Sequence, residues 1–234
     1  MVAPYICQVL VVGAGPVGLA GALELRRRQV SLKIIEKELE SSRTSNAVAI
    51  NARSLELLEP SGATEKLLAA GTRIRRINQY FEGRKLASVD FSRMQHRFNF
   101  MLALPQNETE QILENVLNEA GVQVERGATL TAIEKTGQGV LATAERENQE
   151  PLQFNTGFVL GADGLHSKVR QLAGIEFAGE RYSDQFSLAD VEIDWDFPYD
   201  EGQIFMRKDK PFLFVIAIGQ GRHRIVSNYP NSLD

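Results

Sequence analysis

Apolar runs bounded by glycines and polar turns divide the chain into short strands and helices. Residues 6–12 are continuously apolar and rich in β-branched side chains, which is typical of a parallel strand buried on both faces. A glycine-rich turn, a helical pattern over 19–28 and a second apolar run over 32–35 follow, and this run ends at Glu36. The order of strand, helix and strand predicts a parallel sheet of the α/β class.

Helices and strands continue to alternate up to residue 178. The expected helices cover 52–58, 64–70 and 106–119. Glycine and proline between these segments supply the stop signals. The expected strands are a hairpin formed by 73–81 and 85–91, then 122–125, 130–135, 140–145 and a buried strand at 158–160.

Beyond residue 180 the pattern contains strands alone, expected at 186–193, 203–206, 212–218 and 224–227. The sequence therefore predicts two interleaved domains. One is an α/β, Rossmann-like domain formed by 1–72 and 99–178. The other is a β-rich domain formed by 73–98 and 179–234.

Composition excludes several classes of protein. The hydrophobic fraction of 43% and the charged fraction of 24% are those of an ordinary globular chain, and the net charge of −4 argues against nucleic acid as a partner. A single cysteine, Cys7, excludes an internal disulfide framework, and with only three histidines it also excludes a Cys/His zinc module. Neither a signal sequence nor a transmembrane run is present, so we expect a cytoplasmic protein.

The first turn carries a dinucleotide-binding pattern. Its residues match G-x-G-x-x-G between a strand and a helix, and they are Gly13, Ala14, Gly15, Pro16, Val17 and Gly18. In such a turn the middle glycine lets the backbone approach a pyrophosphate, and the helix N-terminus attracts the phosphates. Glu36 ends the second strand about 20 residues further on, where a carboxylate accepts the ribose hydroxyls. The alternative is a structural turn followed by a surface glutamate.

The longer stretch resembles the fingerprint of FAD-binding proteins. Ala22, Leu25, Leu32 and Glu36 agree with that pattern, whereas Gln29 stands where it usually has glycine. A left-handed residue other than glycine costs about 1–2 kcal/mol, so either Gln29 bears this cost or the helix exits differently.

A second motif resembles one particular family. The residues Gly161-Ala162-Asp163-Gly164, followed by Leu165-His166-Ser167, look like the Asp-Gly motif of the class A flavin-dependent aromatic hydroxylases. This family is related to p-hydroxybenzoate hydroxylase, and the phenol and hydroxyphenylpropionate hydroxylase subgroup is the most similar. The resemblance implies that the loop around Asp163 contacts FAD, with Gly161 and Gly164 beside it. Taken alone, Asp163 would be interpreted as a turn residue.

Further cofactor contacts follow from the same resemblance. Residues 45–58 and 105–110 are similar to segments of the phenol hydroxylase subgroup. Gln106 would then face the flavin, and Arg43 and Arg53 are candidates for the pyrophosphate, although Asn46 stands near the arginine position of relatives. For Arg53, a structural role as a cation that stabilises its own helix is an equally good alternative to contact with the pyrophosphate. Lys37, beside Glu36, is included among the contacts. Leu130 would line the adenine or else serve as a plain core residue.

The resemblance implies an aromatic hydroxylase that uses FAD, O₂ and NADPH or NADH as a transient reductant. FAD performs this chemistry, while the protein orients the substrate and excludes water. We therefore name no catalytic residue and no metal ligand. His96, His166 and His223 are expected to be surface or structural residues.

One family motif is missing, because no Gly-Asp dipeptide occurs in the chain. We therefore expect an N-terminal portion of a hydroxylase with a truncated substrate domain, which alone would be a poor or inactive enzyme. Apolar strands such as 212–218 are expected to be exposed. They would favour association between copies or with a missing C-terminal portion.

Two other functions are alternatives to the hydroxylase. A flavin halogenase or a geranylgeranyl-type reductase shares this scaffold, but halogenases carry Trp-x-Trp-x-x-Pro and this chain has Trp195 alone. The second alternative is a non-catalytic nucleotide-binding module, which the missing Gly-Asp motif would favour.

Overall fold

The computed structural model describes residues 5–41, 47–180 and 185–229, and the chain forms two compact units. The first unit contains 1–44, 60–63 and 107–178, and the second contains 45–59, 64–106 and 179–234. The two units interleave along the chain, as the sequence pattern suggests. Their bounds differ from the expected division, since 45–59, 64–72 and 99–106 belong to the second unit. Short strands in these segments pair with one another, which explains the difference.

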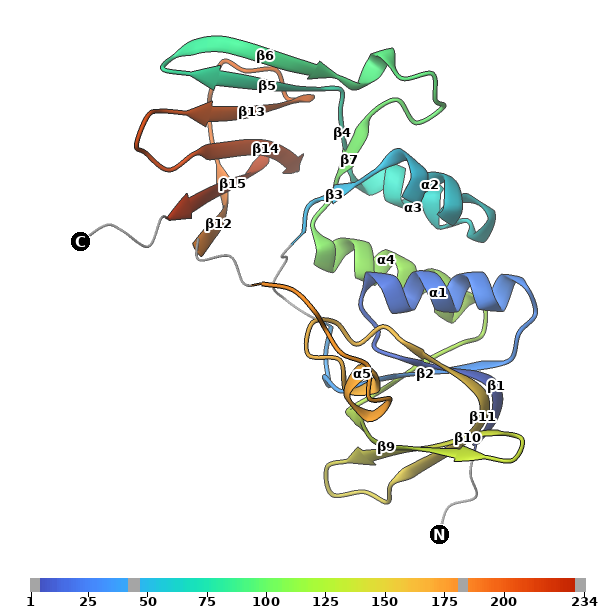
Figure 1. Ribbon diagram of the computed structural model, residues 1–234. Coiled ribbons are helices and arrows are strands. Elements are labelled where there is room, and N and C mark those ends of the chain that lie inside the picture. The colour runs from blue at the N-terminus through green and yellow to red at the C-terminus, as the bar shows by residue number, and fades with distance from the viewer. Residues whose placement is uncertain (1–4, 42–46, 181–184, 230–234) are drawn as a thin grey trace. The chain divides into compact units, whose positions relative to one another are not determined.

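The first unit is built on a six-stranded sheet of order β8-β2-β1-β11-β10-β9 (Figure 1). Strands β8, β2, β1 and β11 run parallel, and β10 and β9 extend the sheet in antiparallel fashion. The elements are β1 (Tyr5–Val12), α1 (Pro16–Arg27), β2 (Leu32–Glu36), α4 (Gln106–Glu119), β8 (Val124–Arg126), β9 (Ala128–Thr136), β10 (Gly139–Arg146), β11 (Leu152–Gly161) and α5 (Lys168–Leu172).

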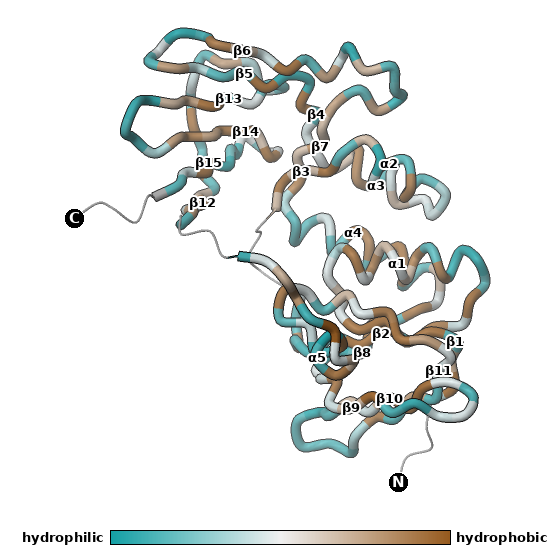
Figure 2. The backbone as a smooth tube through the Cα atoms, viewed as in Figure 1, coloured by the Kyte–Doolittle hydropathy of each residue, from teal (hydrophilic) through white to brown (hydrophobic). Residues whose placement is uncertain are grey.

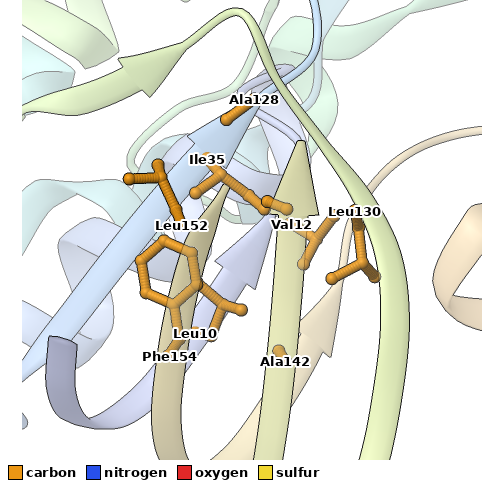
Figure 3. Close-up of a cluster of buried hydrophobic side chains, with 9 residues drawn as sticks. Leu10, Val12, Ile35, Ala128, Leu130, Ala142, Leu152 and Phe154 are labelled. Carbon is orange, nitrogen blue, oxygen red and sulfur yellow. The ribbon is translucent and has the colours of Figure 1, made fainter. Parts of the chain in front are cut away.

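Helices cover this sheet on both sides. Figure 1 shows α1 and α4 together on one side of β1 and β2. On the other side the cluster of buried side chains in Figure 3 joins β1 and β2 to the antiparallel strands, with Leu10, Ile35 and Phe154 at most 1% exposed. Val169 of α5 packs against this cluster. The helices that follow β1 and β11 therefore lie on opposite faces of the sheet.

The second unit holds a six-stranded sheet of order β12-β15-β14-β13-β5-β6 and a three-stranded sheet of order β3-β7-β4. Its elements are β3 (Ala49–Ile50), α2 (Ala52–Leu58), α3 (Ala63–Ala70), β4 (Thr72–Ile74), β5 (Arg76–Phe81), β6 (Arg84–Asp90), β7 (Met101–Ala103), β12 (Gln185–Glu192), β13 (Glu201–Met206), β14 (Leu213–Gly219) and β15 (Arg222–Tyr229). Short 3₁₀ helices occupy Glu59–Ser61 and Phe91–Arg93.

A small apolar core joins the two sheets of the second unit. Ile74 of β4, Ala103 of β7, and Ile216 and Ile218 of β14 are almost fully buried against one another. The tube in Figure 2 shows β14 in hydrophobic colours, in contrast to the polar turns at the ends of the sheet. Strand β14 lies inside the sheet, with β13 and β15 as neighbours.

Most of the expected elements are confirmed within one to three residues. Helices α2 and α4 have the predicted bounds, and the hairpin of β5 and β6 is present. The strand predicted over 73–81 is divided at Arg75, because β4 pairs with β7 whereas β5 pairs with β6 and β13. Gln29 has a φ of 62°, so the left-handed exit from α1 occurs with a residue other than glycine.

Two expectations about burial are wrong. The strand predicted as buried at 158–160 is the end of the longer β11, and Phe158 there is 72% exposed. Strand β10 pairs with β11 only as far as Thr156, so the end of β11 has a neighbour on one side alone. Conversely, residues 215–218, within the run predicted to be exposed, are buried because β14 is an interior strand.

Candidate dinucleotide site

The candidate site lies where three adjacent parallel strands end. Strands β2, β1 and β11 are neighbours, and the loops that leave them are joined by hydrogen bonds. The Gly13 N–H donates to the Ile35 carbonyl at 2.8 Å, and the Ala162 N–H donates to the Val12 carbonyl at 2.8 Å. Since the helices that follow lie on opposite faces, this edge is a topological switch point, the place where open α/β sheets bind ligands.

Glycine is needed at the three positions of the first turn for different reasons. A Cβ atom at Gly18 would overlap the Gly13 carbonyl oxygen, and one at Gly13 would overlap the Ala162 backbone. Gly13 and Gly18 are therefore required by the packing of the two loops. Among the described residues other than its own chain neighbours, the nearest atom to a Cβ at Gly15 would be a carboxylate oxygen of Glu110, at 4.0 Å. Packing thus gives no reason for glycine at position 15, whereas close approach of a ligand does.

The N-terminus of α1 opens at this turn. Gly15 is the N-cap and supplies no side-chain hydrogen bond, and Pro16 is the first helical residue. The first N–H groups of a helix have no partner within the helix and carry a partial positive charge. The backbone at Gly15 and Val17 therefore offers N–H groups suited to phosphate oxygens, whereas Pro16 between them has no N–H to donate.

Glu36 lies at the end of β2 and faces the same turn. Its Oε2 accepts a hydrogen bond of 2.7 Å from the Ala14 N–H, and its Oε1 accepts one of 3.1 Å from the Glu38 N–H. Each carboxylate oxygen has two acceptor positions, so both oxygens can still accept ribose hydroxyls. Lys37 forms an exposed ion pair with Glu38 at 3.5 Å. An open cavity of about 1080 Å³ begins at Lys37 and extends to Arg126 and Thr131.

The Asp-Gly loop after β11 is held by its aspartate. Oδ1 of Asp163 accepts a hydrogen bond from Ser167 Oγ at 2.6 Å, and Oδ2 accepts from the N–H groups of Lys168 and Val169 at 2.6 and 3.1 Å. The Asp163 side chain therefore caps the start of α5. Gly161 packs against Val169, and Gly164 adopts a φ of 75°.

The other predicted contacts lie in several places. Leu130 is in the buried cluster of Figure 3, so its side chain serves the core. Arg53, in the second unit, pairs with Glu56 at 2.6 Å within α2. Gln106 is the first residue of α4, and its N–H donates to the Ala47 carbonyl at 3.0 Å. Arg43 lies outside the described residues.

Sequence reasoning missed two polar residues near the site. Glu110 of α4 is only 6% exposed and lies beside Gly15. A glutamate three residues before Leu113, on the buried side of α4, is the signal that could have identified it. The second is Ser167 of the Asp-Gly motif, whose Oγ caps α5 by accepting a hydrogen bond of 3.0 Å from the Arg170 N–H.

In the second unit, the buried Arg224 forms an ion pair with Asp190, whose side chain is about one third exposed. Arg224 Nε and Nη2 donate to the two carboxylate oxygens of Asp190 at 2.7 and 2.8 Å. This arginine lowers the pKa of Asp190 below its ordinary value. His223, the next residue to Arg224, is also buried, and burial lowers its pKa, which agrees with a structural role.

The fold and the donor set define a dinucleotide-binding α/β unit. The open backbone at Gly15, the uncapped N-terminus of α1 and the carboxylate of Glu36 together fit the pyrophosphate and ribose of FAD. A family model described as FAD binding domain matches residues 6–230. The chain belongs to this family.

Two curated relatives have similar sequences. Pentachlorophenol 4-monooxygenase of Sphingobium chlorophenolicum is 33% identical over 222 residues, which are 93% of this chain and 41% of that protein. The 6-methylpretetramide 4-monooxygenase of Streptomyces rimosus is 33% identical over 221 residues, 94% of this chain and 39% of that protein. The chain thus spans about two fifths of the length of these relatives.

Solved structures show the same fold. The p-nitrophenol 4-monooxygenase of Pseudomonas putida has a TM-score of 0.89 at 20% identity, over 99% of this chain and 60% of that one. The anhydrotetracycline hydroxylase of Streptomyces rimosus has a TM-score of 0.76 at 28% identity, over 97% of this chain and 46% of that one. The family expected from the two motifs is therefore confirmed, and these matches do not favour the halogenase, the reductase or the non-catalytic module.

The described residues contain neither a candidate metal cluster nor a helix suited to span a membrane. Within 5–41, 47–180 and 185–229, no three His, Cys, Asp or Glu side chains gather in a way that could hold a metal ion. In the same part of the chain, no helix has the length and apolar character needed to cross a membrane.

Proposed function

We propose that the chain is the FAD-binding and substrate-binding part of an aromatic-ring monooxygenase that uses O₂ and NADPH or NADH. The observation that carries the proposal is the backbone at Gly15, beside which the described part of the chain leaves room that a pyrophosphate would fill. The names of the relatives, pentachlorophenol 4-monooxygenase and 6-methylpretetramide 4-monooxygenase, support the aromatic substrate.

Each candidate contact has a proposed role. The first turn and Glu36 follow from the geometry above, and the others follow from the resemblance. The proposed contacts are Gly13, Ala14, Gly15, Pro16, Val17, Gly18, Arg43 and Arg53 for the pyrophosphate, Glu36 and Lys37 for the ribose, Leu130 for the adenine, and Gln106, Gly161, Asp163 and Gly164 for the flavin side.

When bound, FAD supplies the redox chemistry, taking reducing equivalents from NADPH or NADH and activating O₂ for transfer of one oxygen atom. The residues of the chain bind and orient it. The N-terminus of α1 offsets the charge of the pyrophosphate, and Glu36 fixes the ribose. Asp163 holds the second loop in place by capping α5, so its effect on the cofactor passes through the backbone of that loop.

Titration of the purified protein with FAD tests the proposal. We expect saturable binding of one FAD per chain, which ADP competes away because the ADP half carries the contacts. A phenol added to the FAD-loaded protein is then expected to shift the visible absorption bands of the flavin. Absence of FAD binding would contradict the cofactor assignment. FAD binding without any spectral response to a panel of phenols would contradict the aromatic substrate.

A further inference from the structure

The loop between β12 and β13 lies over one face of the six-stranded sheet in the second unit. We name this loop, residues 193–200, the strap. Trp195 and Phe197 of the strap are partly buried, whereas the neighbouring Asp194 and Asp196 are exposed. The strap therefore turns its aromatic side chains toward the sheet and its carboxylates toward solvent.

Aromatic contacts join the strap to the sheet. The ring centroid of Phe197 lies 4.9 Å from that of Trp195, 5.8 Å from that of Phe205 of β13 and 6.0 Å from that of Tyr80 of β5. Residues 193–200 form no strand of their own, although all of them are described. Packing of rings therefore holds the strap against the sheet.

His223 of β15 lies against two rings of the strap. The ring centroids of Trp195 and Tyr199 are 5.3 and 5.4 Å from that of His223, with interplanar angles of 78° and 80°. Within the sheet, His223 is flanked by Val191 of β12 and Ala217 of β14. His223 is 4% exposed, and neither of its ring nitrogens has a hydrogen-bond partner among the described residues.

The charged side chains of the strands beside His223 point to the other face of the sheet. Successive residues of a strand alternate between the two faces, and His223 shares its face with its partner on β12. Arg222 and Arg224 of β15, with their partners Glu192 and Asp190 of β12, therefore face away from His223. Strand β14, the other neighbour of β15, has no titratable side chain.

The remaining charged groups around this face have other partners or are exposed. Glu201, the one ionisable residue of β13, accepts hydrogen bonds of 2.9 Å from Arg76 and 2.6 Å from Asn78. The carboxylates of the strap are exposed, and they belong to Asp194, Asp196 and Asp200. A protonated His223 would thus be a buried cation without a carboxylate partner, which is strongly unfavourable. Cation–π attraction to the two rings of the strap offsets only part of this cost.

We propose that the strap is a proton-sensitive cover, and that uptake of a proton by His223 releases Trp195 and Tyr199 from the sheet and brings the imidazolium into contact with water. Burial lowers the pKa of His223 below its ordinary value of 6.5, while the Gly221 carbonyl acts in the opposite direction. The closed strap is therefore favoured above the ordinary pKa and loses stability as pH falls below it. The inference concerns the second unit alone, so it does not depend on FAD binding.

Trp195 reports on the strap directly, because it is the only tryptophan of the chain. We expect acrylamide to quench its fluorescence about twofold more strongly at about pH 5 than at about pH 7.5, because His223 is protonated within this range. Far-UV circular dichroism of the same samples should stay constant, since the strap opens while the sheet remains folded. Unchanged quenching, or loss of the circular dichroism signal over the same range, would overturn the inference.

Two variants test whether His223 is the group that takes up the proton. His223→Gln and His223→Phe cannot be protonated, so quenching of Trp195 should be equal at the two pH values in both. His96→Gln is the matched control, since it removes a partly exposed histidine of the same unit and should keep the wild-type response. A wild-type response in a folded His223 variant would contradict the inference.

A titration of the wild-type protein by NMR decides the question even where the His223 variants do not fold. The single indole N–H of Trp195 and the ring C–H groups of the three histidines are followed between about pH 7.5 and about pH 5. We expect the indole signal to shift with the same midpoint as one histidine, and this midpoint to lie below 6.5. An indole signal that stays fixed, follows no histidine, or follows one with an ordinary midpoint would reject the inference.

Discussion

The Ala14 N–H donates a hydrogen bond of 2.7 Å to the Glu36 carboxylate and so ties the glycine turn to the end of the second strand. This bond places a negative charge beside the turn that is proposed to hold the pyrophosphate. The charge is tolerated because the carboxylate accepts two backbone N–H groups and lies near the positive end of α1. Glu36 therefore has a structural role and a proposed ribose-binding role at the same time.

Substitution of Glu36 separates its two roles. Glu36→Ala is expected to weaken FAD and ADP binding by about 1–3 kcal/mol, because charge-assisted hydrogen bonds to the ribose are lost. Calorimetric titration with ADP measures the change. Glu65→Ala is the control, since Glu65 is an exposed glutamate of α3 in the second unit. An ADP affinity that is unchanged in Glu36→Ala would remove Glu36 from the site.

The glycines of the first turn are expected to respond differently to alanine. Gly18→Ala should lower the free energy of unfolding by roughly 1–3 kcal/mol, because the new Cβ would overlap the Gly13 carbonyl. Gly15→Ala should leave the unfolding free energy nearly unchanged and weaken ADP binding instead, because its Cβ projects into open space. Urea denaturation and ADP titration of both variants measure this contrast. If Gly15→Ala binds ADP normally, the pyrophosphate lies elsewhere.

Substitution of Asp163 is expected to change mainly the free energy of unfolding, since its side chain holds the start of α5. Asp163→Ala removes three hydrogen bonds at the start of α5 and should cost about 1–2 kcal/mol of unfolding free energy, the range for loss of a helix cap. Asp163→Asn retains an acceptor for the N–H groups and should lose less. Thermal unfolding of the two variants gives the comparison, and equal stability of all three proteins would contradict the capping role.

The βαβ start and the two motifs could be predicted because each depends on local sequence. A buried strand, a glycine turn and an amphipathic helix leave a strong pattern, and α4 shows its periodicity through Leu113, Val116 and Leu117. Strands β3 and β7 could not be predicted, since two or three residues pair only because a partner is already in place. The exposure of Phe158 likewise depends on where the neighbouring strand β10 ends, and the residues around Phe158 do not indicate that position.

The site was predictable to the same extent. The spacing pattern gives Gly15 and Glu36 as candidate site residues, whereas the hydrogen bonds of Asp163 depend on the later residues 167–169. Glu110 approaches Gly15 from a helix that lies about 95 residues further along the chain, a distance over which a single sequence carries no pairing signal. The candidate residues that lie close together in the sequence could thus be derived from it, whereas contacts between distant residues could be found only from the three-dimensional structure.

Acid is expected to destabilise the second unit through Asp190. Arg224 lowers the pKa of this carboxyl below 3.8, so the folded state binds the proton less readily than the unfolded state. The stability from the pair is present above the unfolded pKa and is lost as pH falls through the lowered folded pKa. The unfolding free energy of the wild-type protein should therefore decrease more steeply below about pH 4 than that of Asp190→Asn.

Urea denaturation at several pH values between neutral and acid measures these slopes. Asp209→Asn is the matched control, because Asp209 is exposed in the turn between β13 and β14 and should leave the slope of the wild-type protein unchanged. If the unfolding free energies of the wild-type protein and Asp190→Asn fall in parallel as pH decreases, this ion pair makes no pH-dependent contribution to stability.

The same carboxylate of Glu36 should make the site select against a 2′-phosphate. ADP is expected to compete with FAD at least about tenfold more effectively than 2′-phospho-ADP, because a phosphate on the ribose would face a like charge at short range. Lys37 offsets only a small part of this repulsion, since its ammonium is exposed to solvent and pairs with Glu38. Glu36→Gln removes the negative charge, so ADP and 2′-phospho-ADP should compete with FAD more equally in this variant. This selectivity does not apply to NADPH as the reductant, because NADPH would bind transiently at another place. Equal competition by both ligands in the wild-type protein would mean that the ribose hydroxyls do not face Glu36.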